Sequence, residues 1–251
     1  MDKQSEDVFL EAKLNDAVRL AQNGGRPRFV GFLDERQARI AENRMARIHF
    51  ENYMLFGGQE DAERVVFGAF PDFLEPDAGL FPISAVTACF RSCDRLGHRD
   101  FMGAILATGI QREALGDILL ETGRCVFFVR SEISDFLLSQ ISKIGKVGVT
   151  MKEGAEEPLP PRGQFANFSA VVASPRLDCI VAAVVGTSRE KSCEMIRAGM
   201  VMLNHEEILS VSAAVTPGSK LSVRGKGRFV LDRLGPVTKK GRLSIAGRKY
   251  I

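Results

Sequence analysis

The stretch RLDCIVAAVVGTSREKSCEMIRAGMVMLN, residues 176–204, decides the fold of the C-terminal part of the chain. Its apolar run predicts a helix over 177–185. Thr187 and Glu190 have the spacing of a capping box, and Ser188 can serve as the same cap. A second helix is therefore predicted to start there and to end before the glycine of IRAG, with a short strand following at MVMLN.

The stretch KLSVRGKGRFVLDRLGPVTKKGRLSIAGRKYI, residues 220–251, supplies further strands and much of the positive charge. Strands are predicted over 221–224 and 228–234, and the glycines of RGKG allow a sharp bend between them. The last 36 residues hold ten basic side chains and one acid, Asp232. We therefore expect two helices docked on a small, strongly curved sheet, followed by a basic C-terminal extension.

Positive charge is concentrated in this end of the chain. From Arg176 onward there are 14 Lys and Arg residues and six Asp and Glu residues, a net charge of +8, which leaves −5 for residues 1–175 of the total of +3. A basic module of this kind focuses an electric field on a polyanion such as RNA.

The candidate RNA contacts are residues at the helix starts and around the basic turn of this module. They are Arg176, Ser188, Arg189, Lys191, Arg197, Lys220, Arg224, Lys226 and Arg228. Arg176 and Arg189 are the strongest candidates, because each stands at the start of a predicted helix and a guanidinium can grip a phosphate with two hydrogen bonds. The basic residues between Lys239 and Lys249 either bind RNA diffusely or only solvate the surface.

The first part of the chain is expected to be an N-terminal α/β region. Apolar residues at helical spacing predict an amphipathic helix over 5–22 and a second helix over 34–47, with Asp34 as its N-cap. Aromatic and β-branched residues on both sides of a Gly-Gly turn predict two strands within 49–72. Prolines and aspartates then place a boundary near residue 77.

The middle of the chain alternates between predicted strands and predicted helices. Strands are predicted over 81–90, 115–120, 125–129 and 147–151, and helices over 99–108 and 133–144. This is the order of a split βαβ sandwich, the plan also used by the RNA recognition motif (RRM). The RNP-type aromatic signature of an RRM is missing, and Phe127 and Phe128 are expected to serve packing more than base stacking, because neighbours in a strand point to opposite faces.

The segment KEGAEEPLPPR, residues 152–162, is the clearest linker, since it suits neither a helix nor a strand. The predicted organisation is thus an α+β protein of three folded parts and one linker. The parts are an N-terminal region over 1–77, an RRM-like domain over 78–151, a linker over 152–164 and a C-terminal RNA-binding domain over 165–251.

The order RLD, SR, IRAGMVMLN and PGSKLSVRGKGRF resembles the RNA-binding domain of the small ribosomal subunit protein four type, hereafter the S-four domain, whose core is an alpha-L motif. GHRDFMGAILATGIQREALGDI, residues 97–118, and the ending GRFVLDRLGPVTKKGRLSIAGRKYI are similar to the YlmH family. Members of that family carry an N-terminal region, an RRM-like segment and a C-terminal S-four domain, so the resemblance spans nearly the whole chain.

The resemblance implies a non-enzymatic RNA-binding factor. It would associate with the rRNA of the large ribosomal subunit and with peptidyl-tRNA, in ribosome-associated quality control of stalled nascent chains. Two alternatives stay open: an RNA-modifying enzyme of the pseudouridine synthase or methyltransferase type that its S-four domain targets to RNA, and a ribosome maturation factor.

A polar motif in the middle segment could be mistaken for a catalytic cluster. Its members are His98, Arg99, Asp100, Arg112, Glu113 and Asp117. Helix capping, ion pairing or RNA contact is the favoured interpretation over catalysis. We expect no catalytic residue, no cofactor, no metal and no small-molecule substrate.

The remaining composition indicates a cytoplasmic protein that is a monomer off the ribosome and does not enter membranes. Five scattered cysteines without CxxC spacing predict reduced, mostly buried thiols in a reducing compartment. The N-terminus MDKQSEDVFL is not a secretory signal, and no stretch has the roughly 20 apolar residues that span a bilayer.

Overall fold

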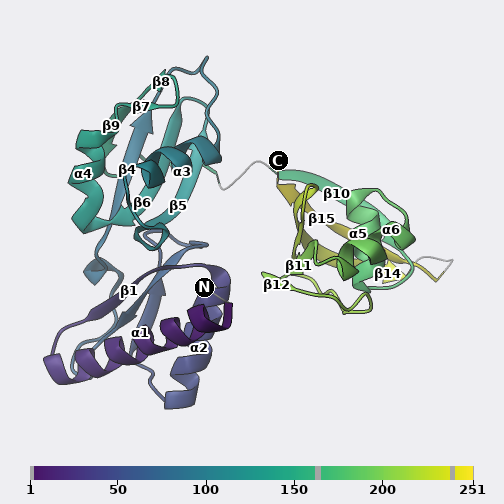
Figure 1. Cartoon of the computed structure of the whole chain (residues 1–251), viewed down its shortest axis with the longest axis horizontal. Helices are drawn as coiled ribbons and strands as arrows, with labels where there is room; N and C mark the ends of the chain where they lie inside the picture. The colour runs from purple at the N-terminus through teal and green to yellow at the C-terminus, as the bar shows by residue number, and fades with distance from the viewer. Residues whose placement is uncertain (1–2, 162–164, 238–240, 251) are drawn as a thin grey trace. The chain divides into compact units, whose positions relative to one another are not determined.

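A computed structural model describes residues 3–161, 165–237 and 241–250, and divides the chain into two compact units, Met1–Arg162 and Gly163–Ile251. Figure 1 shows the elements of both units along the chain. The mixture of helices and sheets confirms the predicted α+β class. The finer division of the first unit near residue 77 and the linker over 152–164 stay predictions.

The N-terminal part of the first unit is a three-stranded antiparallel sheet with two helices. Its elements are α1 (Lys3–Gly24), β1 (Arg28–Leu33), α2 (Glu35–Ile48), β2 (Tyr53–Phe56) and β3 (Val65–Ala69), and the strand order is β1-β3-β2. Both predicted helices are present. Asp34 caps α2 as predicted, because its carboxylate accepts a hydrogen bond from the Gln37 N–H at 2.8 Å while the Gln37 side chain accepts one from the Asp34 N–H.

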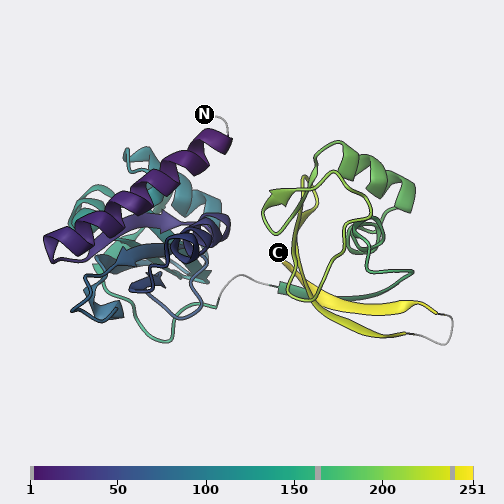
Figure 2. The same ribbon diagram turned by 90° about the horizontal axis from the view of Figure 1, so that it is seen from below.

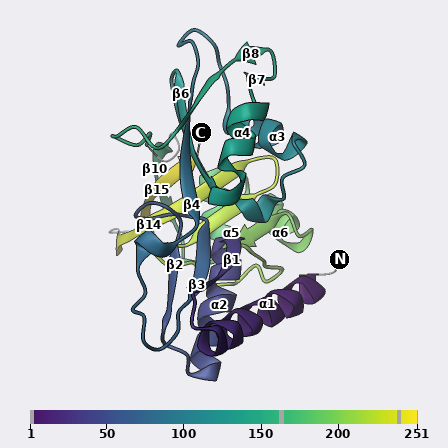
Figure 3. The same cartoon turned by 90° about the vertical axis from the view of Figure 1, so that its left-hand side faces the viewer.

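The middle part of the first unit has the predicted split βαβ topology. Its elements are β4 (Ile83–Cys89), α3 (His98–Ala107), β5 (Leu115–Glu121), β6 (Arg124–Arg130), α4 (Ser134–Gln140) and β9 (Thr150–Glu153). The four strands are antiparallel in the order β5-β6-β4-β9, and α3 and α4 lie on one side of this sheet (Figure 3). Short 3₁₀ turns at Ala78–Leu80, Arg112–Ala114 and Ser131–Ile133 connect the elements.

The predicted helix over 133–144 is wrong at its C-terminal end. Helix α4 stops at Gln140, and residues up to 148 form a small hairpin of β7 (Lys143–Ile144) and β8 (Val147–Gly148). Gly145 in its turn has a φ of +59°, a left-handed conformation that suits glycine. Ile141 and Ile144 are still buried, so the apolar pattern that predicted a longer helix reflects burial in two successive elements.

The two sheets of the first unit share a buried apolar cluster. Its buried members come from the N-terminal sheet, the connection before β4, and the sheet face that α3 and α4 leave open: Phe32, Val66, Phe70, Phe81, Leu119, Val126 and Phe128. The opposite face of the four-stranded sheet buries Val86 and Phe127 under the helices. Both faces of this sheet are therefore packed.

The second unit is a six-stranded antiparallel sheet with two helices. Its elements are β10 (Phe165–Val172), α5 (Leu177–Val185), α6 (Arg189–Arg197), β11 (Val201–Leu203), β12 (Glu206–Glu207), β13 (Lys220–Val223), β14 (Gly227–Val237) and β15 (Leu243–Tyr250). The strand order is β10-β15-β14-β13-β11-β12. The expected two helices on a sheet are present, and Figure 2 shows them (green) on one side of the long strands (yellow).

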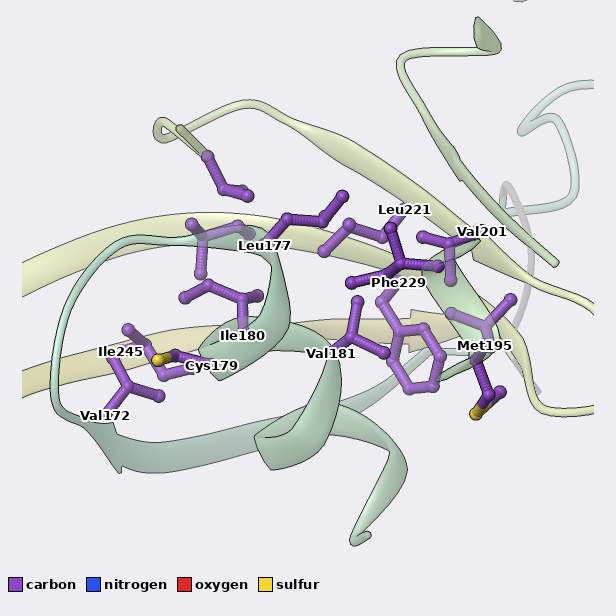
Figure 4. Close-up of a cluster of buried hydrophobic side chains, with 14 residues drawn as sticks. Val172, Leu177, Cys179, Ile180, Val181, Met195, Val201, Leu221, Phe229 and Ile245 are labelled. Carbon is purple, nitrogen blue, oxygen red and sulfur yellow. The ribbon is translucent and has the colours of Figure 1, made fainter. Parts of the chain in front are cut away.

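The core of the second unit lies between the helices and the sheet. Figure 4 shows Val181 of α5 and Met195 of α6 near the Phe229 ring of the sheet, while Ile180 of α5 lies nearer Ile245. Helix α5 is apolar almost throughout because it packs against this core, and burying side chains of this size supplies most of the stability of such a unit.

The C-terminal stretch is a strand and not the basic extension that its charge suggested. β15 pairs with β10 from Leu243 to Tyr250 and with β14 on its other side, so it is an interior strand of the sheet. Gly247 allows this close pairing, because a Cβ there would meet the carbonyl oxygen of Val230 and the ring of Phe168. Lys239 and Lys240 lie outside the described residues.

All five cysteines are free thiols, but they are less buried than expected. Cys125 and Cys179 are buried, Cys89 and Cys193 are half-buried, and Cys93 is exposed. Desolvation by burial raises the pKa of Cys125, which makes that thiol inert. Within the described part of the chain, no helix is long and apolar enough to cross a membrane.

Candidate nucleic-acid interface

A buried carboxylate holds two of the predicted RNA-contacting arginines. Asp178, in the first turn of α5, is only 1% exposed. The Nε of Arg176 donates to Asp178 Oδ1 at 3.1 Å, and the Nε of Arg189 donates to Asp178 Oδ2 at 2.8 Å. The side chains of Arg176 and Arg189 remain 40% and 57% exposed. Each guanidinium is thus fixed on one side by Asp178 and open to solvent on the other.

The same two arginines stabilise the ionised form of Asp178. Burial alone would raise the pKa of the carboxyl, but hydrogen bonds and charge from Arg176 and Arg189 outweigh burial and lower the pKa to about 2 from its ordinary 3.8. The backbone N–H of Cys179 also donates to Asp178 Oδ1, at 3.0 Å. The carboxylate is therefore ionised at neutral pH and orients both guanidiniums.

The starts of the two helices are brought together around Asp178. Arg176 is the N-cap of α5 and Arg189 is the first residue of α6. The Ser192 hydroxyl donates to the carbonyl of Asp178 at 2.7 Å, which ties α6 to α5. The N–H groups of Leu177 and Asp178 are already paired with the carbonyls of Ala213 and Val211. The attraction for an anion therefore comes from the two exposed guanidiniums, with a contribution from the positive ends of the helix dipoles.

The cap of α6 is Ser188 and not Thr187. The Ser188 side chain accepts a hydrogen bond from the Lys191 N–H at 3.2 Å. Ser188 and Lys191 are exposed beside Arg189, so they extend the arrangement at the helix starts.

A second group of predicted residues lies at the other end of α6. Arg197 is in the last turn of that helix, and the basic turn after β13 begins with Arg224, whose N–H donates to the carbonyl of Met200 at 2.9 Å. Arg197, Arg224 and Lys226 are all exposed. Helix α6 has nine residues, so its two ends are roughly 12 Å apart.

Two of the nine predicted residues lie on the other face of the sheet. Leu221 and Phe229 point into the core, and side chains alternate along a strand, so Lys220 and Arg228 face away from the helices. Arg228 instead lies over the ring of Tyr250, with its Cζ 4.5 Å from the ring centroid. The structure therefore separates the single predicted site into a helix-side group and an outer-face pair.

Comparisons with known proteins agree with this architecture. Residues 90–157 match the family model described as "Putative RNA-binding domain in YlmH". The chain is 28% identical over 242 residues to the "Ribosome-associated protein quality control protein P2" of Bacillus subtilis (strain 168), covering 95% of this chain and 93% of that protein. Both matches support the YlmH family that the sequence motifs suggested.

A solved structure has a similar fold. The "Cell division protein ylmH from Streptococcus pneumoniae" superposes with a TM-score of 0.53 at 21% sequence identity, over 60% of this chain and 92% of that one.

The part matched by the YlmH model does not offer the sheet face that an RRM uses. Phe127 and Phe128 are both buried, at 0% and 3% exposure. Phe127 packs under the helices, and Phe128 packs in the cluster shared with Phe32 and Phe70 of the N-terminal sheet. The expectation that both rings serve packing is confirmed, and bases cannot stack on this face because protein covers it.

The first half of the polar motif caps a helix. Asp100 accepts a hydrogen bond from the Gly97 N–H at 2.7 Å at the start of α3. His98 and Arg99 are exposed in the same first turn. Helix capping, which the sequence favoured for Asp100, is confirmed.

The second half of the motif braces the loop before β3. Asp117 accepts hydrogen bonds from the N–H groups of Glu63 and Arg64 at 2.8 and 3.0 Å. The Arg64 guanidinium donates to the carbonyls of Leu115 and Arg112 at 2.9 and 3.1 Å. Burial, and then the charge of Arg112, lower the pKa of Arg64 to about 10. These contacts join the N-terminal sheet to β5, which is a structural role.

Residues 3–161, 165–237 and 241–250 contain no candidate metal site. No three His, Cys, Asp or Glu side chains gather there in a way that could hold an ion.

Sequence reasoning missed Asp178 as the organising residue of the helix-side group. The available signal was a lone acid inside the apolar helix LDCIVAAVV, since a buried carboxylate needs charged or hydrogen-bonding partners. Arg64 was missed as well, because its partners are backbone carbonyls that no sequence pattern marks.

Proposed function

We propose that this protein is a non-enzymatic, ribosome-associated RNA-binding factor that acts in quality control of stalled nascent chains. Its partners are the rRNA of the large ribosomal subunit and peptidyl-tRNA, and its place of action is the cytoplasm. The proposal draws on the similarity to the YlmH family and on the name of the Bacillus subtilis relative, a ribosome-associated quality control protein. In this proposal the second unit is an S-four domain.

The observation that carries the proposal is the pair of arginines that Asp178 orients. A phosphate is held best by guanidiniums whose geometry is fixed beforehand, because less side-chain entropy is then lost on binding. Arg176 and Arg189 meet this condition and stay exposed. Ser188, Lys191, Arg197, Arg224 and Lys226 would extend the contact along α6 toward a neighbouring stretch of the RNA backbone.

The test is co-sedimentation with purified large ribosomal subunits over a series of salt concentrations. Glutamine replaces arginine in the double variant Arg176→Gln with Arg189→Gln, because its amide can still donate to Asp178 and spares the unit an unpaired buried carboxylate. We expect association to fall at least ten-fold at intermediate salt. The magnitude of the slope of log K against log salt should fall by about 2, since each phosphate contact that forms releases roughly one counterion and the variant forms two fewer.

A matched control removes the same charge from the first unit. Arg19→Gln with Arg47→Gln replaces two exposed arginines of α1 and α2 and should leave association unchanged. Wild-type sedimentation of the Arg176/Arg189 variant would contradict the proposal. An equal loss in the control variant would also contradict it, because net charge alone would then explain binding.

A further inference from the structure

The outer face of the six-stranded sheet, the face turned away from α5 and α6, carries its own basic and aromatic surface. Strand alternation and register place these side chains on it: Phe165, Lys220, Arg228, Asp232, Arg233, Arg248 and Tyr250. Figure 2 shows the helices on the opposite side of the long strands. By the same register Glu207 of β12 also lies on this face. Four basic residues against two acids still give it the sign of charge that attracts a polyanion.

Two aromatic rings and two guanidiniums are stacked at one end of this face. The rings of Phe165 and Tyr250 meet edge to face, with centroids 4.7 Å apart. Arg228 lies over Tyr250 at 4.5 Å, and Arg248 lies over Phe165 at 5.2 Å. These contacts span β10, β15 and β14, which pair side by side in the sheet.

The second guanidinium is also fixed from the side. Asp232 accepts hydrogen bonds from Nε and Nη2 of Arg248 at 2.9 and 2.8 Å. Val230 pairs with Arg248 and Leu231 points into the core, so alternation along β14 places Asp232 on the same face as Arg248. The shift in register between Leu231 and Arg233 then brings Arg233 to this face as well. Both arginines are exposed although they lie over rings.

We propose that this outer face is a second RNA-binding surface, one that takes single-stranded RNA with unstacked bases. The stacked pairs Arg228–Tyr250 and Arg248–Phe165 supply planar surfaces for two bases, and Lys220 and Arg233 contact the backbone phosphates. Bases stack on aromatic rings and on guanidinium planes with little regard to sequence. The inference extends the proposed RNA-binding function, but it uses residues apart from the arginine pair held by Asp178.

The charge and geometry favour RNA over other partners. An acidic peptide would satisfy the four basic residues but would leave the stacked planes without a use. Duplex RNA would satisfy the charges too, but its bases are stacked within the helix and cannot reach the rings. Single-stranded RNA is the polyanion that uses both features.

The test measures binding of the full chain to a fluorescent twelve-nucleotide pyrimidine RNA and to an RNA duplex of similar charge. Phe165→Leu with Tyr250→Leu removes the rings but keeps apolar side chains in the strands. We expect roughly ten-fold weaker binding of the single strand, an unchanged salt slope and little change for the duplex. Arg228→Lys keeps the charge but loses the planar group, and it should weaken the single strand several-fold without changing the slope.

Three results would overturn the inference. The first is a leucine double variant that binds the single strand with wild-type affinity, and the second is an equal loss of affinity for the single strand and the duplex. The third is a polyglutamate peptide that binds the wild type as tightly as RNA does and binds the same variants more weakly. Hydrogen exchange across β10 and β15 confirms that each variant is folded. The large-subunit assay on the Arg176/Arg189 variant uses other residues and another RNA. The proposed function can therefore hold while this inference fails, and this inference can hold while the proposed function fails.

Discussion

Asp178 is the residue on which the geometry of the helix-side group depends, so its replacement is the most direct test at the scale of single residues. Asp178→Asn keeps the shape but removes the charge that orients Arg176 and Arg189. We expect a loss of about 2 kcal/mol in the free energy of unfolding of the second unit, since hydrogen bonds to charged groups contribute about 1.5–3 kcal/mol. Urea titration with a brief hydrogen-exchange pulse, read on peptides from α5 and α6, measures this loss.

The difference between wild type and Asp178→Asn should depend on pH in a defined direction. The folded state lowers the pKa of Asp178 to about 2 from 3.8, so its stabilisation is present above pH 4 and is lost as the pH falls toward 2. The two proteins should therefore converge in acid. Asp232→Asn is the control, because that carboxylate is 36% exposed and its loss should cost less than about 1 kcal/mol. A constant difference down to pH 2 would contradict this role of Asp178.

The residue scale also shows what the sequence could and could not predict. The RLD and SR motifs identified Arg176 and Arg189, because helix-start positions follow from local capping patterns. Their shared partner depends on how α5 and α6 pack, which is a tertiary fact. Lys220 and Arg228 were assigned to the same site as the helix-start arginines, although strand alternation places them on the opposite face of the sheet.

At the scale of elements, the largest difference between the predicted and the observed structure is at β15. Glycines, a proline and lysines around residues 235–241 hide the strand pattern, and the high charge suggested an extension. The alternation of Leu243 and Ile245 was the remaining signal, and Ile245 is fully buried. Pairing partners for β15 come from β10, about 80 residues earlier in the chain, and no local pattern predicts such a distant partner.

The interior position of β15 makes a prediction about its stability. Amides from Leu243 to Tyr250 should exchange as slowly as those of β13 and β14, because both edges of β15 are hydrogen-bonded. Gly247→Val should lower that protection by about 1–3 kcal/mol, since its side chain would press on the Val230 carbonyl and on Phe168. Gly148→Val serves as the control, because a Cβ there would meet nothing within 4 Å and the backbone has no positive φ. Rapid exchange of 243–250 in the wild type would contradict the pairing.

At the scale of the whole molecule, the first unit joins two parts that the sequence separated near residue 77. Proline and aspartate mark the connection clearly, but they say nothing about packing across it. The coupling comes from apolar side chains on both sides, with Phe32 and Phe70 before that point and Val126 and Phe128 after it. In the local sequence each of these residues has the pattern of an ordinary strand residue. The sequence pattern of either part alone therefore does not predict that they share one cluster.

Phe128→Ala tests whether these two parts unfold together. The ring is 3% exposed, so its loss leaves a cavity that should cost roughly 3–5 kcal/mol. If the shared cluster couples the parts, hydrogen-exchange protection should fall in β1–β3 as well as in β5 and β6. Phe101→Ala is the matched control, because it removes the same ring from the helix side of the sheet, where the N-terminal strands do not pack. Protection of β1–β3 should therefore fall further in Phe128→Ala than in Phe101→Ala at equal loss of protection in β6. Unchanged protection of β1–β3 in Phe128→Ala would mean that the N-terminal part is stable by itself and that the cluster is only a contact between two independent domains.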